Sequence, residues 1–358
     1  MRFRVGRRSR PASPADGDPA GPGPTPEVEA GPSPSGRPVP PSPTGLDVLL
    51  AAPRIGRMSD AERVAMTISC PDTTELARVP EAGTVVDRDG RRVQILHNGT
   101  VVEADGYCGP WMTEIIRELG GYHEPQEERA FAAIVDRLDP APTIVEVGAF
   151  WAYYSLWVNH RWPDGRAVAV EPDPHNRALG ERNAALNAMA DRMTFLAGAA
   201  GSDHGATVRL ALDSDPTQSV ESPVMSLDGL RADGTVDRCD ILHLDVQGAE
   251  YDALLGAREA IAAGALRFVV ISTHHYLFSG TPLTHSQCLQ FVDDHGGHLI
   301  AHHTVAESYS GDGLIVASFD QRDRDLQVPV SRNHTDRSLF RPLEEDVATL
   351  VAYIDGQG

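Results

Sequence analysis

The sequence has few cysteines, no long apolar run and little positive charge. Its four cysteines stand far apart and form no C-x-x-C pair, at Cys70, Cys108, Cys239 and Cys288. This argues against a disulfide framework and favours a reducing compartment. No stretch approaches the roughly 20 apolar residues of a membrane span. Arginines are frequent in the first ten residues, but no apolar segment follows them, so we expect no secretory signal and a cytoplasmic protein.

The shortage of positive charge bears on possible partners. The chain has 31 lysines and arginines against 51 aspartates and glutamates, a formal net charge of −20. Such a surface repels nucleic-acid phosphates and anionic lipid headgroups, so we expect neither nucleic acid nor membrane as a partner. Its 358 residues suffice for one large domain or two medium ones, and the oligomeric state stays open.

The organisation changes along the chain. Residues 1–44 are rich in Pro, Gly and Ser and poor in large apolar side chains, which predicts a disordered tail. Between 84 and 107, Asp-Gly and Asn-Gly pairs separate short β-prone runs, which predicts a small meander. Helices are expected over 110–119 and from Pro125 onward. We expect three parts after the tail, an N-terminal cap, a main domain and a C-terminal extension with a helix, over residues 45–140, 141–320 and 321–358.

From residue 143 onward, strands and helices alternate. Helices are expected over 151–160, 174–190 and 248–262, and this alternation predicts a parallel sheet with helices on both faces. The strand candidates are 143–147, 166–171, 193–197, 240–245 and 267–272. Two last strands, 298–305 and 313–319, are joined without a helix and should pair antiparallel. The predicted fold class is α/β, a mostly parallel, seven-stranded, Rossmann-like sheet with a closing antiparallel hairpin.

Polar and small residues follow the strands where such a sheet binds its ligands, at the carboxyl ends. Gly148 follows the first strand, but no G-x-G-x-x-G is present, so a pyrophosphate is not the expected ligand. Glu171 ends the second strand, where an acidic side chain accepts ribose hydroxyls. Ala199 follows the third strand and is small enough to lie against a flat base. S-adenosylmethionine has a ribose and a base but no phosphate, and it suits this set.

Further residues complete the expected cofactor site. The faces of Phe150 and Tyr153 could enclose a sulfonium, or these rings could pack in the core. Gln126 and Glu127 could reach the methionine amino group, or be solvated residues of a first helical turn. Asp245 ends the fourth strand, near the sulfonium or the acceptor, or it caps the next helix. The residues expected to contact the cofactor are Gln126, Glu127, Glu146, Gly148, Phe150, Tyr153, Glu171, Pro172, Ala199 and Asp245.

Methyl transfer to a hydroxyl needs alignment of the reactants and removal of one proton. Histidine is the natural base near neutral pH, and His274 and His275 follow the fifth strand. They and Asp245 are the expected catalytic residues. With His302 and His303 they could also form a divalent metal site, but neighbouring strand residues point to opposite sides, so a simple base is preferred. The expected walls of the acceptor pocket are Tyr107, Trp111, Tyr276 and Phe278.

Three segments resemble the FkbM family of S-adenosylmethionine-dependent O-methyltransferases. They read IVEVGAFWAYYSLW, AVAVEPDPHNRALGERNAALN and CDILHLDVQGAEYDALLGA. The resemblance spans roughly residues 105 to 320. It implies a class I methyltransferase fold, S-adenosylmethionine as cofactor, and a hydroxyl of a small natural product or sugar as acceptor. The sequence departs from the usual family motifs at Glu146, Phe150, Ala152, His243 and Gln247.

Two rival interpretations stay open. An NAD(P)-dependent oxidoreductase shares the glycine turn and the ribose acid, but it needs a second and a third glycine that this sequence lacks. A non-catalytic relative would keep the fold and lose turnover, as the departures at Phe150, Ala152 and His243 permit. Binding of a nicotinamide nucleotide would favour the first rival. Binding of S-adenosylmethionine without transfer would favour the second.

Overall fold

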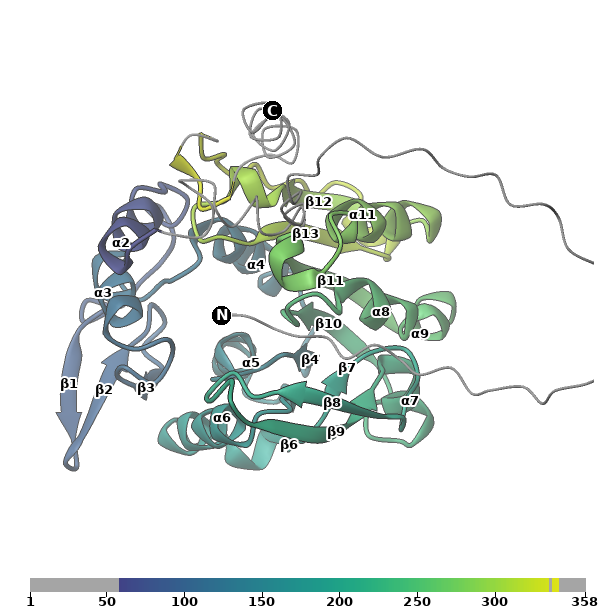
Figure 1. Ribbon diagram of the computed structural model, residues 1–358, viewed down its shortest axis with the longest axis horizontal. Coiled ribbons are helices and arrows are strands. Elements are labelled where there is room, and N and C mark those ends of the chain that lie inside the picture. The colour runs from purple at the N-terminus through teal and green to yellow at the C-terminus, as the bar shows by residue number, and fades with distance from the viewer. Residues whose placement is uncertain (1–57, 335–336, 341–358) are drawn as a thin grey trace, which may run out of the picture.

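The computed structural model describes residues 58–334 and 337–340 (Figure 1). The tail expected over residues 1–44 lies outside the described residues. Within the expected C-terminal extension, the described part includes the 3-10 turn η3 (Gln321–Asp323), and residues 341–358 again lie outside. No helix in the described part of the chain is long and apolar enough to cross a membrane.

A seven-stranded sheet forms the centre, in the order β12-β13-β11-β10-β4-β5-β6. Neighbours from β11 to β6 pair in parallel, whereas β13 pairs antiparallel with both β11 and β12. This confirms the predicted fold class, including its closing hairpin. The strands are β4 (Thr143–Val147), β5 (Arg166–Val170), β6 (Met193–Leu196), β10 (Cys239–Leu244), β11 (Leu266–Thr273), β12 (His298–His303) and β13 (Gly313–Ser318).

The strands are apolar because both faces of the sheet are covered. Alternate side chains enter two separate cores: Ile144 belongs to one, and Val145 and Val147 belong to the other. Helices α4 (Pro125–Val135), α5 and α6 pack in the first core, and α7, α8, α9 and α11 pack in the second. The helices of the main domain are α5 (Tyr153–Arg161), α6 (Pro174–Leu186), α7 (Leu227–Ala232), α8 (Glu250–Leu255), α9 (Arg258–Ala262), α10 (Tyr276–Ser279) and α11 (Thr284–Asp294), with 3-10 turns η1 (Ala190–Arg192) and η2 (Val305–Glu307).

The prediction of a single helix over 248–262 is wrong, because this segment forms two separate helices, α8 and α9. Gly256 ends α8, and a Cβ atom at this position would lie 2.6 Å from Cβ of Ser226 and 2.8 Å from the carbonyl oxygen of Gly201. The close approach of these segments therefore requires the glycine. Gly201 and Ser226 directly follow two strands of a small three-stranded sheet that the sequence did not predict. Its strands are β7 (Ala199–Ala200), β8 (Thr207–Ala211) and β9 (Ser219–Met225).

The N-terminal elements contain the predicted meander. Its third strand lies against α6, where Asn187 Oδ1 accepts the Val101 N–H and Asn183 Oδ1 accepts the Glu103 N–H. These bonds occupy the free edge of β3 and fix the meander beside the central sheet, as Figure 1 shows. The elements are α2 (Asp60–Ile68), β1 (Val85–Arg88), β2 (Arg91–Ile95), β3 (Val101–Glu103), α3 (Pro110–Glu118) and α4 (Pro125–Val135).

Candidate functional site

The ends of β4 and β10 meet at Gly148. This glycine has φ +77°, and a Cβ atom on it would lie 1.7 Å from the carbonyl oxygen of Asp245. The N–H groups of Gly148 and Ala149 both donate to the carbonyl oxygen of Val170 at the end of β5. Three neighbouring strand ends are thus joined with no room for a side chain at this position.

The loop after Gly148 keeps a glycine-like shape without further glycines. Phe150 has φ +40° and Ala152 has φ +63°, both in the left-handed region. This conformation costs an ordinary residue about 1–2 kcal/mol. The Phe150 N–H donates to Oε2 of Glu171 at 3.0 Å, and Ala152 is fully buried. These contacts hold the loop in place despite the departures from the usual motif.

Glu171 stands at the end of β5, with 6% of its surface exposed. Its Oε1 accepts the Asp173 N–H at 2.8 Å, and its Oε2 accepts the Phe150 N–H. Burial raises the pKa of Glu171 to about 7. Each oxygen holds one backbone donor, which leaves acceptor positions on both for a ligand. Pro172 follows half-buried, and Ala199 lies buried in β7.

The polar groups of Glu146 and Tyr153 form hydrogen bonds with other groups of the protein. Glu146 is buried, and its oxygens accept the N–H groups of Tyr154 and Ser155 in the first turn of α5. The Tyr153 hydroxyl donates to Glu128 at 2.5 Å, and its ring is 1% exposed. Glu146 thus caps α5 and Tyr153 packs in the core, and their contact with the cofactor stays a prediction.

We expect Tyr153→Phe to separate these two roles. The substitution keeps the ring but removes a hydrogen bond to a buried carboxylate, so the free energy of unfolding should fall by about 1.5–3 kcal/mol. Denaturant titration measures this loss. The affinity for S-adenosylmethionine should stay within twofold of the wild type, whereas a large drop in affinity would return Tyr153 to the cofactor site.

Gln126 and Glu127 also turn toward protein partners. Gln126 donates to the carbonyl oxygens of Glu307 and Ser331, and it accepts the Tyr309 N–H. Glu127 binds Nε2 of His243 at 2.7 Å and the Ser272 hydroxyl at 2.5 Å. The contacts fix α4 to the sheet and to the C-terminal segment. Contact of Gln126 and Glu127 with the methionine amino group stays a prediction.

Four ionisable side chains meet at the carboxyl edge of the sheet. His274, after β11, places Nδ1 2.6 Å from Glu250 and Nε2 3.3 Å from Asp245 and 3.5 Å from Asp312. Asp312 was not among the site residues predicted from the sequence. The signal was present in the predicted hairpin: β13 runs antiparallel to β11 and pairs Gly313 with Thr273, which sets the preceding Asp312 beside His274.

The other predicted residues divide between this cluster and the core. Phe278 lies 6.3 Å from His274, centroid to centroid, and Tyr107 stacks on Trp151 at 4.6 Å and meets the Phe150 ring edge-on. His275 instead stacks on Phe340 at 4.2 Å and begins α10, and burial lowers its pKa to about 4. The ring of Tyr276 lies 4.0 Å from that of His275.

The last predicted wall residue, Trp111, lies on α3 beneath the guanidinium of Arg63, 4.5 Å from the ring centroid. The alternative of a divalent metal site involved His302 and His303 together with His274, His275 and Asp245. Within the described part of the chain, no group of three or more His, Cys, Asp or Glu side chains is arranged to hold a metal ion.

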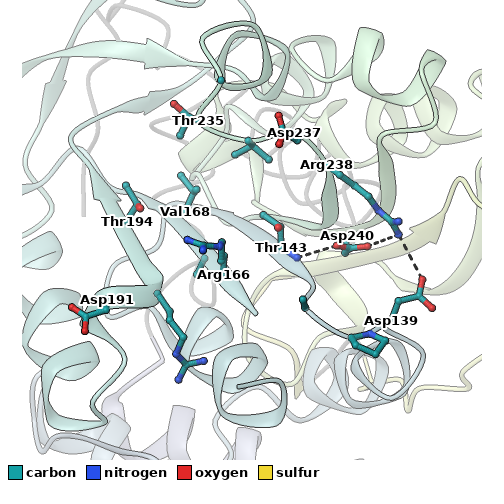
Figure 2. A pocket seen from close by; sticks show the side chains of 16 residues that line it. Asp139, Thr143, Arg166, Val168, Asp191, Thr194, Thr235, Asp237, Arg238 and Asp240 are labelled. Carbon is teal, nitrogen blue, oxygen red and sulfur yellow. Dashed lines mark hydrogen bonds and ion pairs between the residues drawn. The ribbon is translucent and has the colours of Figure 1, made fainter. Parts of the chain in front are cut away.

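A distinct hollow of about 310 Å³ lies at the opposite edge of the sheet (Figure 2). Its lining includes Thr143, Arg166 and Thr194, which stand at the amino ends of their strands. There Asp240 accepts the Thr143 N–H at 2.9 Å and pairs with Arg238 at 2.6 Å, as the dashed lines show. Parallel sheets bind their ligands at the carboxyl ends, so this hollow is not the candidate site.

Comparison with known proteins agrees with the resemblance seen in the sequence. Residues 129–299 match the model of the methyltransferase FkbM domain. This span contains Gly148, Glu171, Asp245 and His274, which the fold brings to one edge of the sheet. The comparison with curated proteins found no match.

Similarity to solved structures is distant. A precorrin-6y C5,15-methyltransferase from Geobacter metallireducens GS-15 is 16% identical over 52% of this chain and 86% of its own, with a TM-score of 0.33. A ribosomal protein L11 methylase from Lactobacillus delbrueckii subsp. bulgaricus is 13% identical over 60% and 81%, with a TM-score of 0.34. The strand order, and not these similarities, establishes the fold. Residues 129–299, just under half of the chain, are therefore similar to the methyltransferase FkbM domain.

Proposed function

We propose that the protein is a cytoplasmic S-adenosylmethionine-dependent O-methyltransferase that acts on a hydroxyl of a small molecule, such as a natural product or a sugar. The observation that carries the proposal is the convergence of Gly148, Glu171 and Asp245 at the carboxyl ends of three neighbouring parallel strands. Ligands of open α/β sheets bind at this edge. The family match over residues 129–299 supports methyl transfer as the reaction.

The residues at this edge fit the proposed cofactor. An ionised carboxylate offers about four acceptor positions, and backbone N–H groups use one on each oxygen of Glu171. The remaining positions suit the two hydroxyls of a ribose. The tight turn at Gly148 brings the backbone of β4 close to that of β10, which forms the floor for the methionine end. The negative charge of Asp245 nearby favours a positively charged sulfur.

The chain's own task is alignment and proton removal. When bound, S-adenosylmethionine supplies a methyl group on a sulfonium, which is already activated for transfer. Tyr107, with Phe278 next to His274, would provide apolar walls that orient the acceptor. The ionisable cluster around His274 would receive the proton that the hydroxyl loses.

Calorimetric titration with S-adenosylmethionine and S-adenosylhomocysteine tests the proposal. We expect micromolar binding by the wild type and at least a tenfold loss of affinity in Glu171→Ala, equivalent to about 1.4 kcal/mol. Glu181→Ala is the matched control, because Glu181 is an exposed acid of the neighbouring helix α6. Binding of NADH in place of both ligands would overturn the proposal in favour of an oxidoreductase.

The same titration should depend on pH. Burial raises the pKa of Glu171 to about 7, so below this pH the free protein holds the carboxyl protonated. Ribose hydroxyls donate to the ionised form. The affinity of the wild type should therefore rise as the pH increases from 6 to 8. For S-adenosylhomocysteine, which lacks the positive sulfur, Glu171→Ala should lose this increase, and an unchanged increase for that ligand would remove Glu171 from the ribose site.

A further inference from the structure

The ionisable cluster is more exposed on one side than on the other. The side chains of Asp245 and Asp312 are 31% and 30% exposed, whereas those of His274 and Glu250 are 8% and 0% exposed. The two aspartates therefore face open space, and the histidine lies behind them. A group that arrives from solvent meets carboxylate oxygens before it meets the imidazole.

The histidine is held as a cation. Burial by itself would lower the pKa of His274, but the charges of Asp312 and Glu250, the hydrogen bond to Glu250 and the charge of Asp245 raise it to about 10. Glu250 is in turn fixed by the Gly248 N–H at 2.9 Å. A protonated imidazole has no lone pair to accept a proton, so His274 does not suit the role of base that the sequence suggested.

One N–H group serves two carboxylates. Nε2 of His274 carries a single hydrogen, yet Asp245 and Asp312 both lie within 3.5 Å of it. Two carboxylates that lie this close to one N–H in a partly desolvated site cannot both be ionised at low cost, so one of them tends to hold a proton. Consistent with this, burial raises the pKa of Asp245 to about 7 and raises that of Asp312 as well.

Other charges around the pair are mixed. The charge of His243 lowers the pKa of Asp245, whereas that of Glu127 raises it. For Asp312, Arg63 lowers the pKa, whereas Glu250 and Glu127 raise it. Tyr107 reports the same environment: burial, followed by the charges of Cys108, Glu124, Asp245 and Asp312, raises its pKa well above the usual value. The expected acceptor wall and the carboxylate pair therefore lie close enough to interact.

We propose that Asp245 and Asp312 together are the proton acceptor of the methyl-transfer site, and that His274 and Glu250 are positioning residues. This rests on the proposed function. In the free protein the pair holds one proton, and the arrival of a sulfonium displaces that proton to solvent. The acceptor oxygen then gains the methyl carbon while its own proton passes to a carboxylate of the pair. The electrons of the broken carbon–sulfur bond stay on sulfur.

A proton count on ligand binding tests this without a known acceptor. S-adenosylhomocysteine has the same amino acid, ribose and base as S-adenosylmethionine but lacks the methyl group and its positive charge. Titrating the full-length protein with each ligand at pH 6.5, in buffers of different ionisation enthalpy, gives the protons released. We expect S-adenosylmethionine to release up to one proton more than S-adenosylhomocysteine, with a smaller difference at pH 8.5. Titration of Glu171 affects both ligands and cancels in the comparison.

Variants assign the difference to the pair. Asp312→Asn and Asp245→Asn should each abolish the extra proton release, because the remaining carboxylate then has His274 to itself. Asp325→Asn should retain it, since Asp325 is exposed and pairs with Arg137 far from the cluster. Equal proton release by both ligands in the wild type would overturn the inference and leave the proposed function standing. Failure of both ligands to bind would overturn the proposed function, and the inference with it.

Discussion

Gly148→Ala should destabilise the protein more than any other single methyl addition in the candidate site. The new Cβ would lie 1.7 Å from the carbonyl oxygen of Asp245, which is backbone and cannot swing aside. To accommodate it, β4 and β10 must separate at the edge where the site forms. We expect the free energy of unfolding to fall by about 4 kcal/mol or more, with loss of cofactor binding. Thermal unfolding and calorimetric titration measure the two effects.

Gly90→Ala is a matched control for this substitution. Gly90 has φ +76°, against +77° for Gly148, but a Cβ atom on it would meet nothing within 4 Å. The control therefore carries the conformational strain alone, which costs about 1–2 kcal/mol. The excess loss in Gly148→Ala is then the cost of the clash. Equal melting temperatures for the two variants would show that the strand ends are not packed as tightly as described.

Glu127→Ala should cost about 3–5 kcal/mol, because it removes one partner of a buried charge pair. Glu127 and His243 are both buried, and the Ser272 hydroxyl completes the set. The substitution leaves an imidazole and a hydroxyl without partners beneath α4. Glu127→Gln keeps the shape and should recover part of the loss. Urea unfolding measures the effect, and Glu114→Ala, in an exposed pair with Arg117, should change stability by less than about 0.5 kcal/mol.

The pH dependence of this loss has a defined sign. Burial raises the pKa of Glu127, but the hydrogen bond and charge of His243 outweigh it and leave the pKa below 4.5. For His243 burial lowers the pKa, and Glu127 outweighs it and leaves the pKa above 6.5. The pair therefore stabilises fully between about pH 4.5 and 6.5. Its contribution declines below that window as Glu127 is protonated, and above it as His243 loses its proton. A deficit that is constant across these pH values would contradict the assignment.

The sequence alone determined the central fold. The apolar runs that became β4, β5, β10 and β11 are buried on both faces, so their composition identifies them without any partner. The order of strands and helices then leaves few possible topologies, and the closing hairpin followed from its short connection. The sequence also places Gly148, Glu171 and Asp245 at one edge of the sheet, because the residues after parallel strands all lie at their carboxyl ends.

Only the tertiary structure decided what the polar side chains at this edge do. Whether Glu127 faces a cofactor or a buried histidine depends on His243 and Ser272, which lie 116 and 145 residues away in the sequence. Asp312 joins the cluster through the pairing of β13 with β11, a contact between distant parts of the chain. A strand needs only its own apolar pattern to be recognised, whereas the role and protonation of a carboxylate depend on neighbours that the fold alone brings together.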